Sequence, residues 1–418
     1  MPCDTVCHMA ATHTHTDIHM GSIMIPRLEQ LELANEGYDI LKEHMICYLA
    51  MEERTGKTLT SILIAEMCDN IETVLVVTKK NALEGWETTL KAFPHDKKYR
   101  IVNYHQVHKY GRHDMLILDE AHNYISGYPK PSGLFNTIKN ISGQIPIIYL
   151  SATPHAQGYQ MLYHQLALST WSPWRRYPNF YYWFKDYGIP EYAWFHGRQV
   201  PVYTSTNSEL VLADIQKLFI TKTRKQLNFN HEPVDQVHYM QLDKHTVEHY
   251  NELMKDKLIK IGKQTLVCDT SMKLRTSLHM LEGGVAKIGT DYLTLVNDEK
   301  IQYILKTWGD TDDLVIYYHY IAEGNKLREV FKKATILQAT SYAEGIDLAH
   351  KETIVMYSQD FSTAKHTQRR ARQSAKHRDK PIVVHFLLVK KAISEQVYNT
   401  VSVNKQNFVD SVFERTLL

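Results

Sequence analysis

Short runs of aliphatic and β-branched residues alternate with longer amphipathic stretches along most of the chain, and this alternation constrains the fold most. In the first half such runs occur at residues 46–49, 71–78, 99–103, 115–118 and 145–150. The same rhythm returns in the second half at 314–318, 335–338, 353–357 and 382–388. Continuous apolar runs of this length are typical of parallel strands that helices cover on both faces. The sequence therefore predicts an α/β fold with two strand-rich halves.

The length and the charge balance of the chain limit the classes of protein to which it can belong. The chain has 418 residues, which favours two or three domains, and its 44% of apolar residues argues against global disorder. With 48 Lys and Arg against 46 Asp and Glu, it is no general polycation, so a nucleic-acid partner would require clustered basic charge. The absence of a CxxC pair fits a reducing cytosol, and no apolar run suffices to span a bilayer. We expect a cytoplasmic protein with no membrane partner.

The first segment, residues 1–22, lacks a basic stretch followed by an apolar one, so it is not a secretory signal. We expect a disordered leader rich in His and Thr. A metal site is an alternative, although its candidate ligands match no known spacing: Cys3, Cys7, His8, His13, His15 and His19.

The middle of the chain differs from both halves. Residues 171–210 begin with a dense run of aromatic side chains, which predicts either an inserted subdomain or a stacking surface for bases. The segment 210–227 has a helical pattern and is followed by a linker near 228–233. We therefore expect a first domain at 23–232, with the aromatic insertion inside it, and a second domain at 233–418.

Residues 50–58 read AMEERTGKT and lie between an apolar strand and an amphipathic helix. Strand, tight loop and helix is the context of a phosphate-binding loop, in which the backbone at Thr55 and Gly56 would cradle phosphates. Lys57 would reach the β- and γ-phosphates, and Thr58 would bind Mg²⁺. The full pattern has a glycine where this chain has Met51.

A second candidate element follows the apolar run 115–118, which leads directly into Asp119 and Glu120. The carboxyl end of such a strand is where α/β proteins bind ligands. Asp119 would hold Mg²⁺, and Glu120 would orient and deprotonate the attacking water. Together the two elements predict a nucleoside triphosphatase.

The sequence Asp-Glu-Ala-His at 119–122, with Ser-Ala-Thr at 151–153, resembles motifs of superfamily 2 helicases and translocases. Within that superfamily the chain is most similar to the Swi/Snf-like branch, in the compact DEAH-box form that phage and bacterial genomes carry. The resemblance covers about residues 27–410 through further segments at 74–86, 102–104, 150–155, 339–348 and 368–378. It implies two RecA-like domains in tandem, with ATP and Mg²⁺ as ligands.

The resemblance also implies roles for matching residues in the first half. Gln30 would read the adenine edge, although a surface glutamine on a helix is the alternative. Ser151 and Thr153 would couple the nucleotide site to nucleic acid, a role compatible with capping the turn after a strand.

Thr78, Lys79 and Lys80 would contact phosphates of the tracked strand; a solvated turn is the alternative.

In the second half, Gly345 and Asp347 match a motif that touches both ATP and nucleic acid, and Gln368 belongs to the following coupling motif. Arg372 matches the arginine finger that stabilises charge on the γ-phosphate. The position of a second finger holds Ala375, so that role would pass to another arginine in the segment, namely Arg369, Arg370 or Arg378.

These residues lead us to expect an ATP-dependent DNA helicase or translocase that moves along duplex or branched DNA. The compact phage-type resemblance implies a role in phage replication or recombination, such as branch migration, in the host cytoplasm. An RNA helicase of the same superfamily and a motor subunit of a larger complex are alternatives. Met51 and Ala375 also keep open a binding module whose catalytic site has decayed.

Overall fold

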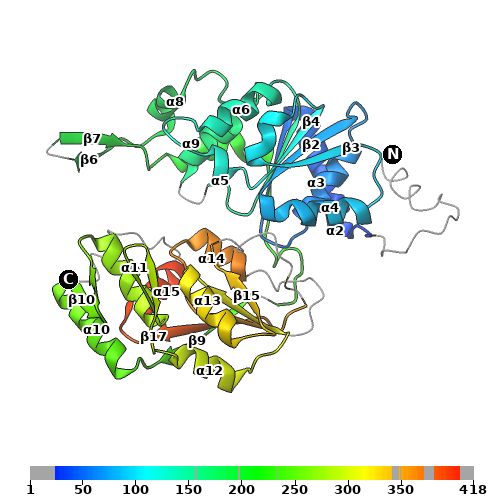
Figure 1. The fold of residues 1–418 in the computed structure, drawn as a ribbon. Coiled ribbons are helices and arrows are strands. Elements are labelled where there is room, and N and C mark those ends of the chain that lie inside the picture. The colour runs from blue at the N-terminus through cyan, green and yellow to red at the C-terminus, as the bar shows by residue number, and fades with distance from the viewer. Residues whose placement is uncertain are drawn as a thin grey trace, which may run out of the picture. The chain divides into compact units, whose positions relative to one another are not determined.

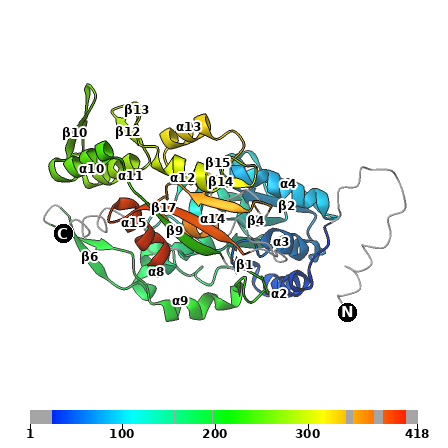
Figure 2. The ribbon, with the colours of Figure 1, turned by 90° about the horizontal axis from the view of Figure 1, so that it is seen from below.

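The computed structural model divides into two compact units, residues 1–227 and 228–418. Each unit is an α/β body built around one parallel sheet, which confirms the predicted fold class and is consistent with two RecA-like domains (Figures 1 and 2). The structure describes residues 24–155, 158–195, 198–231, 233–340, 348, 350–370 and 381–404.

The first unit holds a six-stranded parallel sheet in the order β3-β2-β4-β5-β1-β8. Five of its strands coincide with the predicted apolar runs, whose β-branched residues suit a sheet buried on both faces. The sixth strand, β8, lies where the sequence predicted a continuous helix. The strands are β1 (Ile46–Met51), β2 (Thr73–Thr78), β3 (Lys98–Asn103), β4 (Met115–Asp119), β5 (Ile147–Ser151) and β8 (Phe219–Lys222).

Helices cover both faces of this sheet. Alternate strand residues such as Tyr48 and Tyr149 pack in one apolar cluster with α6 (Gly133–Ser142) and α7 (Leu162–Leu166). The intervening residues, such as Cys47 and Leu49, are buried as well, and α2 and α3 contact β1. The other helices of this part of the first unit are α2 (Leu28–His44), α3 (Lys57–Glu66), α4 (Leu83–Ala92) and α5 (His122–Ile125).

The aromatic segment packs as an inserted subdomain. Trp174, together with Phe180, Trp183 and Tyr187 of α8 (Phe180–Tyr187), is buried in the same cluster as the sheet residues. Burial of these rings agrees with the first of the two alternatives for this segment.

The chain then leaves the core in a hairpin of β6 (Glu191–Phe195) and β7 (Arg198–Val202) (Figure 1). The side chains of Tyr192 and Trp194 on this hairpin are exposed. The predicted helix over 210–227 is wrong beyond its start, because α9 (Ser208–Ile215) gives way to β8.

The second unit holds a five-stranded parallel sheet in the order β15-β14-β16-β17-β9. Four strands match the predicted runs: β14 (Leu314–Tyr318), β15 (Thr335–Gln338), β16 (Thr353–Met356) and β17 (Val383–Val389). The fifth, β9 (Val234–Met240), was not predicted, because polar residues interrupt its apolar ones. Among the described strands it pairs with β17 alone, at the edge of the sheet.

Around this sheet the helices again lie on both faces. Ile304 and Leu327 pack over alternate strand residues such as Ile316 and Val355, and a separate apolar cluster lies beyond them around two antiparallel pairs of strands. Besides the strands of the parallel sheet, the second unit contains α10 (Lys244–Asp256), β10 (Leu258–Ile261), β11 (Gln264–Val267), α11 (Ser271–Glu282), β12 (Val285–Ile288), β13 (Asp291–Thr294), α12 (Glu299–Thr307), α13 (Ile321–Val330), α14 (Thr363–Arg370) and α15 (Ile393–Tyr398).

Within the described residues, no helix is both long enough and apolar enough to cross a membrane.

Candidate functional site

Three neighbouring strands of the first unit end at the same edge of the sheet and carry the predicted site residues. In the order β4-β5-β1, Asp119 of β4 lies beside Leu150 of β5, and Ser151 of β5 lies beside Ala50 of β1. Parallel strands present their carboxyl ends on one side, where open α/β sheets bind ligands. The phosphate-type loop, the acidic pair and Ser151 are thereby brought together.

The loop between β1 and α3 adopts the tight turn that its sequence predicts. Arg54 and Gly56 have positive φ angles of 68° and 95°, and α3 begins at Lys57. A Cβ atom on Gly56 would lie 2.4 Å from Nε2 of Gln30, so both the backbone conformation and the close approach require glycine. Met51 is the last residue of β1, and it is buried and paired with Lys222, so the strand rather than the turn occupies the position of the missing glycine.

The start of α2 holds this loop in place. A guanidinium nitrogen of Arg27 donates to the Thr55 carbonyl at 2.7 Å, and Nε2 of Gln30 donates to the Gly56 carbonyl at 3.3 Å. Gln30 is only 5% exposed, so the alternative of a surface glutamine is wrong. Nζ of Lys57 donates to the carbonyls of Met51 and Glu52 at 2.8 and 3.0 Å, which keeps the ammonium group at the loop.

Arg224, two residues after β8, balances the acidic residues of the loop. Its backbone N–H donates to a carboxylate oxygen of Glu52 at 2.7 Å, and its guanidinium lies 3.7 Å from Glu52 and 3.5 Å from Glu53. Arg224 and Glu53 are both buried, so water does not screen their charges, and the two opposite charges compensate each other instead. The positive charge of Arg224 therefore offsets the negative charges of the two glutamates, which would otherwise repel an anion bound at this loop.

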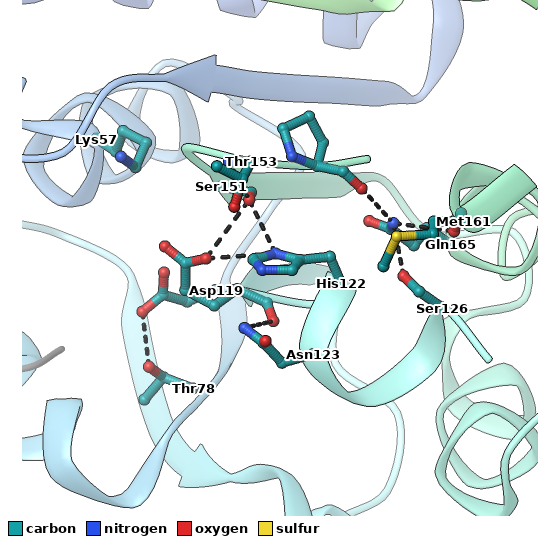
Figure 3. Close-up of polar contacts among 12 residues, drawn as sticks. Lys57, Thr78, Asp119, His122, Asn123, Ser126, Ser151, Thr153, Met161 and Gln165 are labelled. Atoms are coloured by element: carbon teal, nitrogen blue, oxygen red, sulfur yellow. Dashed lines mark hydrogen bonds and ion pairs between the residues drawn. The ribbon is translucent and has the colours of Figure 1, made fainter. Parts of the chain in front are cut away.

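Asp119 lies at the end of β4 with one carboxylate oxygen held by two donors. Oδ2 accepts from the hydroxyl of Thr78 at 2.7 Å and from Nε1 of Trp86 at 3.1 Å (Figure 3 shows the Thr78 contact). Burial raises the pKa of Asp119, and the neighbouring Glu120 raises it further, while Lys57 acts in the opposite direction. A cation bound beside Asp119 would act against both effects, because nearby positive charge favours the ionised form of a carboxyl group.

Glu120 follows in a left-handed backbone conformation, with φ of 53°. Its N–H donates to the Leu150 carbonyl at 2.8 Å, so β5 holds the turn in this uncommon conformation. Its Oε2 lies 3.4 Å from Oγ of Ser151 and 3.3 Å from Nδ1 of His122. Ser151 Oγ and His122 Nδ1 are themselves 2.9 Å apart, and the Ser151 oxygen accepts from the Thr153 N–H at 3.0 Å.

His122 is buried at the start of α5, and this burial lowers its pKa to about 3, with the positive charge of Lys79 lowering it further. The ring is therefore neutral at physiological pH. A neutral imidazole can take part in hydrogen bonds with Ser151 and Glu120 without neutralising the carboxylate.

A second polar group lies behind this site. Nε2 of Gln165, on α7, donates to Ser126 Oγ at 2.7 Å, to the Pro154 carbonyl at 2.9 Å and to the Met161 carbonyl at 3.0 Å (Figure 3). The Tyr48 hydroxyl donates to Gln165 Oε1 at 2.7 Å. The turn after Ser151 is thus tied to the end of α5 and to β1 through one buried amide.

The predicted strand-contacting residues are divided between the core and the surface. Thr78 is fully buried and donates to Asp119, so the prediction that it contacts nucleic acid is wrong for its side chain. Lys79 is half-buried, and Lys80 is exposed at the start of the following turn of 3₁₀ helix. Thr58 lies in the first turn of α3 and is half-buried.

In the second unit, Gly345, Asp347 and Arg372 lie outside the described residues, and Gln368 belongs to α14, although its side chain is not described.

Two of the arginines considered for a second finger already have partners within the second unit. Arg369 is buried and forms two 2.8 Å hydrogen bonds to the two carboxylate oxygens of Asp360. Arg370 donates to Asp235 at 2.7 Å and to the Pro233 carbonyl at the same distance. The Arg369–Asp360 pair is bidentate and buried, as structural pairs are, whereas Arg370 is part-buried and binds a single oxygen of Asp235. Both guanidinium groups are thus engaged within the second unit. Arg378 lies outside the described residues.

Sequence reasoning did not assign four residues that shape the site: Arg27, Trp86, His122 and Arg224. A signal existed for two of them, since His122 ends the Asp-Glu-Ala-His motif and Trp86 ends a segment that carries the family resemblance. Arg27 and Arg224 had none, because their partners are distant in sequence.

No protein-family model matches the chain, and no curated protein matches it. Among solved structures, the chain is similar to a Sulfolobus solfataricus SWI2/SNF2 ATPase core in complex with dsDNA, with 14% identity, coverage of 96% of this chain and 97% of that one, and a TM-score of 0.43. It is also similar to the Sulfolobus solfataricus SWI2/SNF2 ATPase core domain, with 14% identity, coverage of 96% and 94%, and a TM-score of 0.42. Likenesses at this level leave function to be inferred from the site residues.

Proposed function

We propose that this protein is an ATP-dependent translocase or helicase whose ATP hydrolysis depends on nucleic acid. The observation that carries the proposal is the meeting of a phosphate-type loop, with Lys57 at the helix start, and the Asp119–Glu120 pair at one edge of a parallel sheet. A loop of backbone N–H groups, an ammonium group and two carboxylates is the set that nucleoside triphosphate hydrolysis requires.

The residues of this edge fit a magnesium nucleotide. Thr58 and Asp119 would hold Mg²⁺, whose charge would offset the burial that raises the pKa of Asp119. Lys57 would exchange its two loop carbonyls for β- and γ-phosphate oxygens. Glu120 would orient the attacking water and accept its proton. Thr55 and Gly56 complete the backbone cradle, and Gln30 lies next to it, consistent with ATP as the nucleotide.

The nucleic-acid part of the proposal rests on the resemblance of the sequence motifs. We assign Lys79 and Lys80 to phosphates of the tracked strand, and Ser151 and Thr153 to coupling between that strand and Glu120. In the second unit we assign Gly345, Asp347, Gln368 and Arg372 to ATP binding, coupling and stabilisation of γ-phosphate charge.

Duplex or branched DNA is the proposed track, in phage replication or recombination within a host cytoplasm. RNA is the competing track.

ATP turnover measured with single-stranded DNA, duplex, four-way junction and RNA tests the proposal. We expect the strongest stimulation by duplex or junction DNA, and loss of turnover in Glu120→Gln and Lys57→Ala. Glu87→Gln and Lys91→Ala are matched controls, because both side chains are exposed on α4. Stimulation by RNA alone would favour an RNA helicase. Negligible turnover with all four, with Lys57→Ala behaving like wild type, would establish a binding module instead.

A further inference from the structure

A cavity of about 540 Å³ lies in the first unit, away from the residues of the nucleotide site. It lies where the aromatic insertion meets α6 and α7, and the largely buried residues Phe135, Tyr163, Trp174 and Phe180 are part of its lining. This volume falls within the range of small-molecule binding sites, which are commonly lined by aromatic side chains. The volume and the aromatic lining therefore suit a small, partly apolar group.

The rim of this cavity is basic. Lys130, Lys139 and Arg175 line it, all three are exposed, and no aspartate or glutamate is among the lining residues. Within the described part of the chain, none of these three cations forms an ion pair. His164 adds no charge, since burial lowers its pKa to about 4. The cavity thus offers positive charge at its edge to a ligand that brings negative charge.

The aromatic walls are held in place before any ligand binds. The Tyr177 hydroxyl donates to Asp186 at 2.5 Å and accepts from Arg176 at 2.7 Å, while the Tyr177 carbonyl accepts from the Tyr163 hydroxyl at 3.3 Å. Tyr181, at the rim, is 40% exposed, so its ring is available for stacking. Preorganised walls reduce the entropy lost on binding.

We propose that this cavity binds an unpaired nucleotide of a nucleic-acid strand, with the base stacked on Tyr181 and the neighbouring phosphates at Lys130, Lys139 and Arg175. Aromatic stacking combined with a basic groove is how proteins hold single strands without reading sequence. The choice of a strand, rather than a free nucleotide, as the source of this chemistry rests on the proposed function. The proposal adds a single-strand contact that lies apart from the predicted strand-contacting residues Lys79 and Lys80.

Equilibrium binding of a fluorescently labelled oligothymidylate, measured without ATP over a range of salt concentrations, tests this site. We expect Tyr181→Ala to weaken binding about ten-fold, because stacking on one aromatic ring contributes that order of affinity, and Tyr181→Phe to bind like wild type. The double variant Lys139→Ala, Arg175→Ala should lower the slope of log affinity against log salt by about 1.4. Unchanged thermal unfolding would show that these exposed substitutions leave the fold intact.

The matched control is Lys98→Ala with Lys217→Ala, which removes two exposed charges of the same unit outside the cavity and should keep the wild-type slope. Wild-type affinity in Tyr181→Ala would overturn the proposal, as would equal competition by polyglutamate, which carries charge without bases. Displacement of the oligonucleotide by thymidine monophosphate at equal nucleotide concentration would show that the cavity binds a free nucleotide rather than a strand, and would overturn that part of the proposal.

The two proposals fail separately. If the wild-type protein shows duplex-stimulated ATP turnover but does not bind the oligonucleotide, the cavity proposal alone is overturned. Tyr181-dependent binding without any stimulated turnover would support the cavity and overturn the motor.

Discussion

The hydroxyl oxygen of Ser151 lies 2.9 Å from Nδ1 of His122, at the junction of β5 and the acidic motif that follows β4. The same oxygen accepts from the Thr153 N–H and lies 3.4 Å from a carboxylate oxygen of Glu120. A serine hydroxyl has one proton to donate, so it can serve either the neutral imidazole or the carboxylate. The orientation of Glu120 is thereby tied to the turn that carries Thr153.

Ser151→Ala should lower kcat for ATP about ten-fold with little change in KM, since it removes a group that orients Glu120 but leaves the phosphate loop intact. Steady-state turnover with the best stimulating nucleic acid measures this. Ser142→Ala removes another buried serine hydroxyl of the first unit, one that donates to the Leu168 carbonyl, and serves as the control for stability. A change in KM alone would contradict the orienting role.

Arg224→Gln should raise KM for ATP several-fold, because it removes the guanidinium charge that faces the carboxylates of Glu52 and Glu53 beside the proposed phosphate site. The charge explanation predicts that adding Glu53→Gln restores part of the affinity. A double-mutant cycle on KM isolates this coupling. If the second substitution leaves the defect unchanged, Arg224 acts through packing instead.

Trp183→Ala should destabilise the first unit by about 3–5 kcal/mol, because its indole is completely buried in the core cluster. Trp194→Ala is the matched comparison, since that ring is 72% exposed on the β6–β7 hairpin and its loss should cost less than about 0.5 kcal/mol. Urea denaturation followed by circular dichroism compares the two. Equal losses would show that Trp194 packs against apolar residues in solution.

Acid should destabilise the protein as its buried neutral histidines are protonated on unfolding. His164 has a pKa lowered to about 4 by burial, whereas the unfolded side chain has an ordinary value of 6.5. The unfolded state therefore binds an extra proton as pH falls from about 6.5 to 4, and stability decreases through that window by about 3 kcal/mol for this residue. Above the window the contribution is fully present.

His164→Gln should flatten this pH dependence, although it also disturbs the hydrogen bond between His164 Nδ1 and the Gly127 carbonyl. The urea midpoint of each protein is measured at neutral and at mildly acidic pH, and the change between the two pH values is compared with that of wild type. A loss of stability that is the same at both pH values cancels in this comparison. The exposed His105, replaced by Gln, is the control and should keep the wild-type pH dependence. An unchanged slope in His164→Gln would show that other histidines dominate the acid transition.

Most parallel strands could be predicted from sequence, because strands buried on both faces must be almost wholly apolar. The runs that became β2, β4, β5, β14 and β16 are continuous and short, so their pattern is hard to mistake. Strands at the edge of a sheet need not be almost wholly apolar, because they are less buried. Phe219–Lys222 has only four residues and directly follows a helix, while polar residues interrupt the apolar ones of Val234–Met240, so neither was predicted.

Within the site, local sequence was sufficient wherever the chemistry lies in one short segment. The loop around Lys57 and the pair Asp119–Glu120 could be predicted because each follows its own strand within a few residues. The partners of those groups come from elsewhere in the chain: Thr78 and Trp86 for Asp119, and Arg224 for the loop glutamates.

The sequence by itself determined the α/β class, most of the parallel strands and the positions of the loop around Lys57 and of the acidic pair, because burial and short-range turns are encoded locally. The tertiary structure alone decided which strands are neighbours, and so which side chains meet. It turned Thr78 inward onto Asp119, paired Arg369 with Asp360, and enclosed the aromatic cavity with its basic rim. Such contacts join residues far apart in the chain, and only the packing of complete helices and sheets brings them within hydrogen-bonding distance.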